Sequence, residues 1–256
     1  MPPGHGGDHD AMNIYRVSGR LSNSYIVEED GRFFVVDVAL RGEKYIAGFI
    51  KDVLDKDITK VELVVCTHDD GDHSGGIHGL ARECGAAVGL PYASYAPAKK
   101  IWHDPLGLLY RSVTAIEESL RPRMWRMYLN PYRRRRYGKK PVRFVSFPSR
   151  SDDCHIPPDY SLKHNRQLPG FPGWTVIHTP GHSWDSCCYF HALTGSLLSG
   201  DALLGSEKEG GVFPPSIYAN PRQMRRSIRK LKMLNPSHIY PGHGSSFHGE
   251  GLLDHL

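Results

Sequence analysis

The chain has 256 residues, 39% of them hydrophobic, and a net charge of +5, values that suit one large globular domain with a buried core. No apolar run approaches the roughly 20 residues that a membrane-spanning helix needs, and no signal sequence opens the chain, so we expect a cytoplasmic protein. The five cysteines are odd in number, with Cys187 next to Cys188, which argues against a disulfide framework and favours reduced, buried thiols.

The first part of the chain alternates between predicted strands and helices. Residues 13–39 have the pattern of antiparallel strands joined by a turn. A helical stretch at about residues 42–55 precedes a short apolar run, residues 61–66, whose β-branched content suits a buried strand. A helix over about residues 75–84 and a strand over residues 86–90 follow. This alternation predicts an α/β layer arrangement.

A basic, proline-interrupted segment separates the two regular parts of the chain. We interpret residues 92–165 as an insertion with two or three short helices, because scattered prolines limit helix length. Within it, residues 119–150 hold eleven Lys or Arg and no Asp or Glu, whereas the rest of the chain has 21 basic against 27 acidic residues. This stretch could be a solvated surface loop, pack against the acidic body, bind an anionic substrate, or contact nucleic acid or a membrane surface.

Regular structure returns after the insertion. Residues 174–178, 187–190 and 196–199 are predicted strands, and each runs into a polar loop. A helix over about residues 221–234 begins with proline, and residues 238–240 form a last strand before a glycine-rich loop.

Histidines and carboxylates recur at the ends of these strands, each beside glycine. They lie in Thr67-His-Asp-Asp-Gly-Asp-His-Ser-Gly-Gly76, Thr179-Pro-Gly-His-Ser183, Ser199-Gly-Asp201 and Tyr240-Pro-Gly-His-Gly244. Loops that follow rigid strand ends are exposed, and several can converge on one point. Because imidazole and carboxylate are ligands that zinc, iron and manganese accept, these loops predict a metal site.

The order of these residues resembles the signature of the metallo-β-lactamase superfamily, which includes glyoxalase II-like metal-dependent hydrolases. That signature is His-x-His-x-Asp-His, followed downstream by a His, an Asp and a final His. The resemblance covers residues 13–90 and 174–244. It implies an α/β fold, a four-layer αββα sandwich, formed by a single domain of residues 1–256 that carries the basic, partly helical insertion.

The same resemblance implies a dinuclear site, with zinc as the first expectation and iron or manganese as the others. One metal would be held by His68, Asp70 and His182. The other would be held by Asp72, His73 and His243, and Asp201 would bridge the two. Asp72 and Asp201 would also move protons during catalysis. Asp37, at the end of an earlier strand, matches an acid that steadies the metal loop in the family.

Asp70 departs from the signature, which places histidine at this position. A decayed site, a changed metal preference and a ligand variant with ordinary chemistry are the three explanations. A carboxylate is harder than imidazole, so Asp70 as a ligand favours iron or manganese relative to zinc. Similar carboxylate patterns occur in flavodiiron proteins and in the nuclease-like domain of bacterial DNA-uptake channels, but these two resemblances cover only this loop.

Water bound between two cations loses its proton near neutral pH, and the resulting hydroxide can attack a carbonyl or a phosphorus centre. We therefore expect a metal-dependent hydrolase that acts on a small, possibly anionic ester, thioester or lactone. The alternative is a phosphodiesterase or nuclease acting on a nucleotide or nucleic acid. A di-iron redox protein is a third reading, although the sequence has no flavin-binding segment.

Overall fold

The computed structural model describes residues 12–19, 22–92, 104–122 and 156–256. Its first sheet has six strands in the order β1 (Asn13–Ser18), β2 (Asn23–Glu29), β3 (Arg32–Val36), β4 (Val61–Val65), β5 (Ala87–Pro91) and β6 (Tyr160–Leu162). The first three strands pair antiparallel, and the pairs from β3 to β6 are parallel. The antiparallel opening predicted from the sequence is confirmed.

The second sheet also has six strands, in the order β14 (Phe247–His248), β13 (His238–Pro241), β10 (Ser196–Gly200), β9 (Cys187–His191), β8 (Phe171–His178) and β7 (Gln167–Leu168). Only the β10–β13 pair in this sheet is parallel among the described strands. A separate hairpin consists of β11 (Leu204–Ser206) and β12 (Gly211–Phe213).

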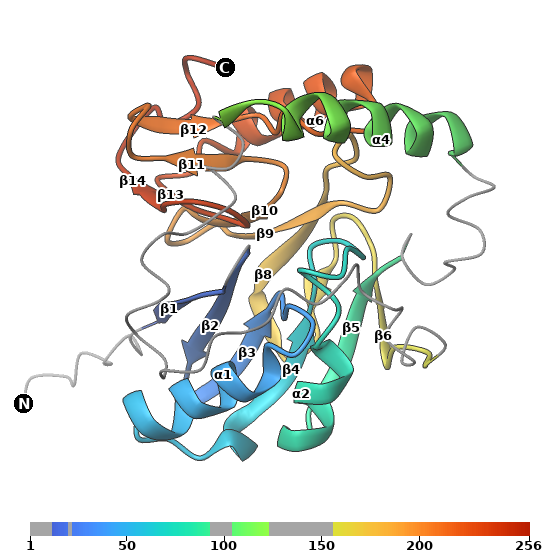
Figure 1. Cartoon of the computed structure of the whole chain (residues 1–256). Coiled ribbons are helices and arrows are strands. Elements are labelled where there is room, and N and C mark those ends of the chain that lie inside the picture. The colour runs from blue at the N-terminus through green and yellow to red at the C-terminus, as the bar shows by residue number, and fades with distance from the viewer. Residues whose placement is uncertain (1–11, 20–21, 93–103, 123–155) are drawn as a thin grey trace, which may run out of the picture.

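Helices cover the outer faces of both sheets (Figure 1). α1 (Glu43–Gly48), which continues into a π-helical turn over Phe49–Val53, and α2 (Ile77–Cys84) lie on the first sheet. A short 3-10 turn, Ile58–Lys60, leads into β4. α4 (Pro105–Ser119) and α6 (Pro221–Leu234) lie at the opposite end of the molecule, on the side of the second sheet.

Three apolar clusters separate these four layers. Successive residues of a strand face opposite sides of a sheet, so each sheet contributes to two clusters. Phe33 of β3 packs on the helical side, whereas Phe34 lies between the sheets with its ring centroid 5.3 Å from that of Trp174. On β9, Cys187 faces the space between the sheets and Cys188 faces the layer that contains α6. The αββα sandwich predicted from the sequence is therefore confirmed.

Two described elements lie within the predicted insertion. α4 is helical as expected, but β6 pairs with β5 and extends the first sheet, so residues 160–162 belong to the sandwich itself. Apart from residues 119–122, the basic stretch lies outside the described residues, and its proposed contacts stay predictions. In the described part of the chain, no helix is both long enough and apolar enough to cross a membrane.

Candidate metal centre

The predicted ligands all lie beyond the carboxyl ends of strands. The loop after β4 carries four of them, and the loops after β8, β10 and β13 carry one each. A backbone hydrogen bond of 2.8 Å from Cys187 N to Thr67 O joins the two sheets beside this loop. The ligands of both sheets therefore meet at one edge of the sandwich.

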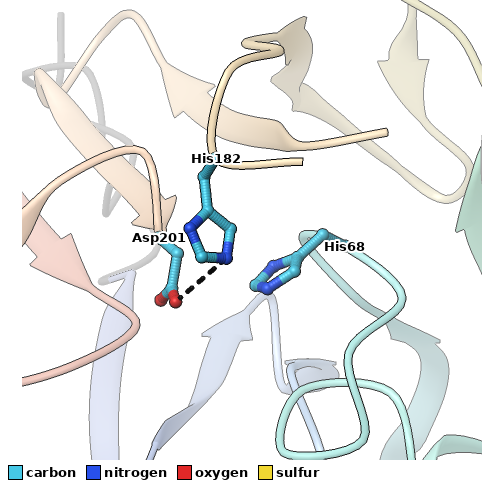
Figure 2. A group of neighbouring side chains, drawn as sticks. All are labelled: His68, His182 and Asp201. Carbon is cyan, nitrogen blue, oxygen red and sulfur yellow. Dashed lines mark ion pairs between the residues drawn. The ribbon is translucent and has the colours of Figure 1, made fainter. Parts of the chain in front are cut away.

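The first group of possible ligands is His68, His182 and Asp201, whose donor atoms lie within 4.8 Å of one another. Figure 2 shows the two imidazole rings and the carboxylate pointing toward a common space. The His182 Nε2 atom is 3.5 Å from Asp201 Oδ2. All three residues are buried, so the group is shielded from solvent.

The second group is Asp72, His73 and His243. The Nε2 atoms of the two histidines face each other at 3.4 Å, and Asp72 Oδ2 lies 3.7 and 3.6 Å from them. Asp201 reaches this group as well, with Oδ1 3.4 Å from His73 Nε2 and Oδ2 3.3 Å from His243 Nε2. Asp201 thus contacts both groups, as a bridging ligand would.

These separations fit a metal. Four ligand atoms placed about 2.0–2.1 Å from a tetrahedral zinc lie roughly 3.3–3.4 Å from one another. Two imidazole nitrogens at 3.4 Å cannot both keep a lone pair directed at the other without a proton or a cation between them. Moreover, His68 Nε2 and Asp201 Oδ1 are buried with no hydrogen-bond partner among the described residues. Buried polar atoms without partners are costly, and a cation would satisfy both.

Hydrogen bonds on the far side of the rings turn the Nε2 atoms into the site. His73 Nδ1 donates to Asp37 Oδ2 at 2.9 Å, and His182 Nδ1 donates to the carbonyl of Ile217 at 2.8 Å. The hydroxyl of Thr67 donates to Asp37, so it accepts from His68 Nδ1 at 3.1 Å. Asp37 also receives the Thr67 N–H at 2.7 Å. Such partners fix the tautomer and orientation of ligating histidines.

The charges of the second group are strongly coupled. Burial alone would lower the pKa of His73, but Asp201, Asp72 and Asp37 raise it well above its ordinary value. Burial likewise opposes protonation of His243, and Asp201 reverses this and raises its pKa. Conversely, burial would raise the pKa of Asp201, whereas His243 and His73 hold it well below the ordinary range. The buried carboxylates of this group therefore favour positive charge beside them.

Asp70 lies beside the first group, with Oδ2 3.2 Å from His68 Nε2 and 3.5 Å from His182 Nε2. It forms a bidentate ion pair with Arg111 of α4, in which Arg111 Nη1 is 3.1 Å from Oδ1 and Nη2 contacts Oδ2. Burial would raise the pKa of Asp70, but the charge of Arg111 holds it well below the usual range. The role of Asp70 as a metal ligand stays a prediction, whereas its pairing with Arg111 was not predicted.

Two further contacts that the sequence analysis missed hold the ligand loops. Asp185 accepts from the Asp69 N–H at 3.0 Å and from the Ser183 hydroxyl at 2.6 Å, which ties the loop after β4 to the loop after β8. Asn23 Nδ2 and the Tyr25 hydroxyl donate to the carbonyl of residue 241 at 3.0 and 2.7 Å, which holds the loop after β13. No pattern in the sequence around Asp185, Asn23 or Tyr25 indicates such a role.

The four-layer sandwich and its two ligand groups define a class of metal-binding hydrolases. The sequence profile of the metallo-β-lactamase superfamily matches residues 17–243, and the chain belongs to this superfamily. It is similar to the probable metallo-hydrolase YqjP of Bacillus subtilis (strain 168), with 30% identity over 89 residues that make up 33% of this chain and 28% of that protein. The matched segments span 21% to 37% of the length of the curated relatives.

Solved structures agree on the fold. The metallo-beta-lactamase family protein TTHA1429 from Thermus thermophilus superimposes with a TM-score of 0.60 at 21% sequence identity, over 96% of this chain and 77% of that one. The protein TTHA1623, in a di-iron-bound form, superimposes with a TM-score of 0.52 at 22% identity, over 92% of this chain and 94% of that one. Similarity at this level of identity concerns the fold alone.

Proposed function

We propose that the protein is a hydrolase that holds two divalent metals in its two ligand groups and cleaves a small ester, thioester or lactone. The observation that carries this proposal is the sharing of Asp201 between the groups, with imidazole Nε2 atoms on both sides of it. The di-iron form of TTHA1623 supports a metal pair in this fold and keeps iron beside zinc and manganese as a candidate.

Bound cations would supply a lowered pKa for water and stabilisation of the negative charge that develops on the substrate. The residues of the chain determine how the substrate approaches and which group exchanges a proton with it. The histidines are essentially buried, whereas the side chains of Asp70 and Asp72 are 23% and 31% exposed, so substrate approaches over these two carboxylates. Asp72 is therefore the carboxylate best placed to exchange a proton with a departing group, whereas Asp201 is buried between the two ligand groups.

A second candidate function, phosphodiester hydrolysis, is favoured by one observation. The Arg111 guanidinium lies beside Asp70 at the open side of the site, and guanidinium suits phosphate oxygens as well as carboxylates. A panel of an ester, a thioester, a lactone and a bis-phosphodiester, tested on one preparation, separates the two functions.

The metal assignment is tested by elemental analysis of Asp201→Ala. We expect close to two metals per wild-type chain and a marked loss in the variant, because both groups lose a shared ligand. Asp52→Ala, an exposed aspartate remote from the site, is the matched control and should keep the wild-type content. Wild-type protein that retains no divalent metal, or an Asp201→Ala variant that retains all of it, would contradict the proposal.

A further inference from the structure

Arg111 reaches the first ligand group from α4. One backbone segment, residues 217–218, contacts both α4 and the ligand His182. The side chain of Asp104 caps the first turn of the helix by accepting from Gly107 N at 2.8 Å. Thr114 of α4 hydrogen-bonds to the backbone of Tyr218, at 3.4 Å from its N–H. The residue before it, Ile217, supplies the carbonyl that orients His182. α4 is therefore placed relative to the site by the segment that also fixes one of its ligands.

The contact between Arg111 and His182 excludes a metal on the same nitrogen. His182 donates from Nδ1 to Ile217, so its Nε2 carries the single lone pair of the neutral ring. Arg111 Nη2 lies 2.9 Å from this nitrogen, and a guanidinium group can only donate hydrogen bonds. A metal coordinated by His182 would need the same lone pair. Metal binding therefore releases one N–H of Arg111.

Asp70 keeps the released guanidinium at the site. Its two oxygens offer about four acceptor positions, so it can hold Arg111 and still face a metal. The Arg111 side chain is 20% exposed and the Asp70 side chain 23%, whereas the His68 and His182 side chains are at most 3% exposed. The guanidinium and the Asp70 carboxylate thus lie on the more exposed side of the first ligand group.

We propose that Arg111 is a substrate-binding residue that exchanges its hydrogen bond to His182 for one to an anionic group of the substrate when the metals bind. The group it takes is a carboxylate or phosphate beside the scissile bond, because the planar guanidinium matches paired anionic oxygens. This inference rests on the proposed hydrolase function and adds to it the class of substrate. It also makes Arg111 a competitor of the metal for His182 in the unloaded protein.

The test compares wild type with Arg111→Gln, which removes the charge, and Arg111→Lys, which keeps the charge but lacks the paired N–H donors of the planar guanidinium. The matched control is Arg121→Gln, near the end of the same helix, whose side chain is 64% exposed and pairs with Glu118. Metal affinities are measured by competition with a chromophoric chelator. Binding of inorganic phosphate and of malonate to the metal-loaded proteins is measured by calorimetry. KM and kcat are measured for an aryl acetate and for its analogue with a carboxylate on the acyl chain.

We expect Arg111→Gln to bind one of the two metals about tenfold more tightly and to lose about 10- to 100-fold in affinity for phosphate, malonate or both, the range of charge-assisted hydrogen bonds. Its KM should rise for the carboxylate-bearing ester alone, with kcat much less affected, and Arg111→Lys should fall between. The anion with the larger loss distinguishes carboxylate from phosphate recognition.

Two results would overturn the inference and leave the hydrolase proposal standing. One is a metal-loaded Arg111→Gln variant that binds both anions as Arg121→Gln does, and the other is an unchanged metal affinity in Arg111→Gln. Failure of the wild type to bind metal would overturn both the inference and the hydrolase proposal.

Discussion

Asp70 combines two interactions that a histidine at its position could not. It can present an anionic oxygen to the first metal and, through its other acceptor positions, hold the guanidinium of Arg111. An imidazole would offer a single lone pair and no charge. Of the explanations that the sequence leaves open, decay of the site fits these contacts poorly, because the remaining ligand atoms keep separations suited to a metal.

Replacing Asp70 tests its role as a ligand. If Asp70 coordinates a metal, Asp70→His should keep the site filled and shift its preference toward zinc, since imidazole is softer than carboxylate. Asp70→Ala should weaken one metal position selectively. Competition between zinc and manganese measures both effects, and the double variant Asp70→His with Arg111→Gln separates the ligand change from the loss of the ion pair. Equal metal preferences in wild type and variants would show that Asp70 serves Arg111 alone.

At the scale of elements, the turn after β13 is packed directly against the ligands. A Cβ atom on Gly242 would collide with Asp201 Oδ1 and would lie 2.8 Å from His73 Cε1. Glycine is therefore required here for close approach of the backbone.

Gly242→Ala should lower metal affinity and cost about 1–3 kcal/mol of unfolding free energy, the usual effect of overpacking. Gly79→Ala in α2, whose nearest neighbour would be 3.5 Å away, is the control and should stabilise by up to about 1 kcal/mol through helix propensity. Urea titrations and chelator competition measure the two effects. A Gly242→Ala variant with unchanged metal affinity would mean that Asp201 and His73 shift to make room for the methyl group without weakening metal binding.

Elements differed in how far the sequence could predict them. β4 and β10 are short apolar runs that end in polar loops, and this pattern predicts both the strand and the place of the ligands after it. β6 and β7 have three and two residues, too few for a periodic pattern.

Arg111 was missed for a different reason. It lies on α4, before the stretch where cations are common, and no sequence period shows which side of this helix faces the site. Its role depends on a contact between residues 41 and 71 positions apart, with Asp70 and His182. The ligands, by contrast, were predictable because each follows a strand within a characteristic loop, whereas their supporting residues, such as Asp185, carry no comparable signature.

At the scale of the whole molecule, the described cysteines are distributed over the separate apolar layers. Cys84 lies between the first sheet and its helices, Cys187 between the sheets, and Cys188 in the layer of α6. All are buried and free, whereas Cys154 lies outside the described residues. Burial raises the pKa of Cys188 to about 12 and that of Cys84 to about 11.

The raised thiol pKa values predict how stability depends on pH. Since the folded pKa of Cys188 lies above its ordinary value of 9.0, its contribution is complete below pH 9 and is lost as pH rises toward 12. Between pH 8 and 10 the unfolding free energy of wild type should therefore fall by about 1.4 kcal/mol more than that of Cys188→Ala. Urea unfolding of both proteins with chelator present measures this difference. If the unfolding free energies of the two proteins changed equally with pH, the pKa of the Cys188 thiol would not be raised by burial.

Because the candidate ligands are divided between the two sheets, a bound metal would also link the sheets to each other. The second group combines Asp72 and His73 from the loop after β4 with His243 from the loop after β13. A cation bound there would be a cross-link that closes a ring of chain containing β5 and β6 of the first sheet and most of the second sheet. With a metal bound, separating the sheets at this edge would require breaking coordination bonds, so the sandwich would open no faster than the metal leaves. A chelator would act on this protein as a local denaturant, and metal supply would set its lifetime against proteolysis.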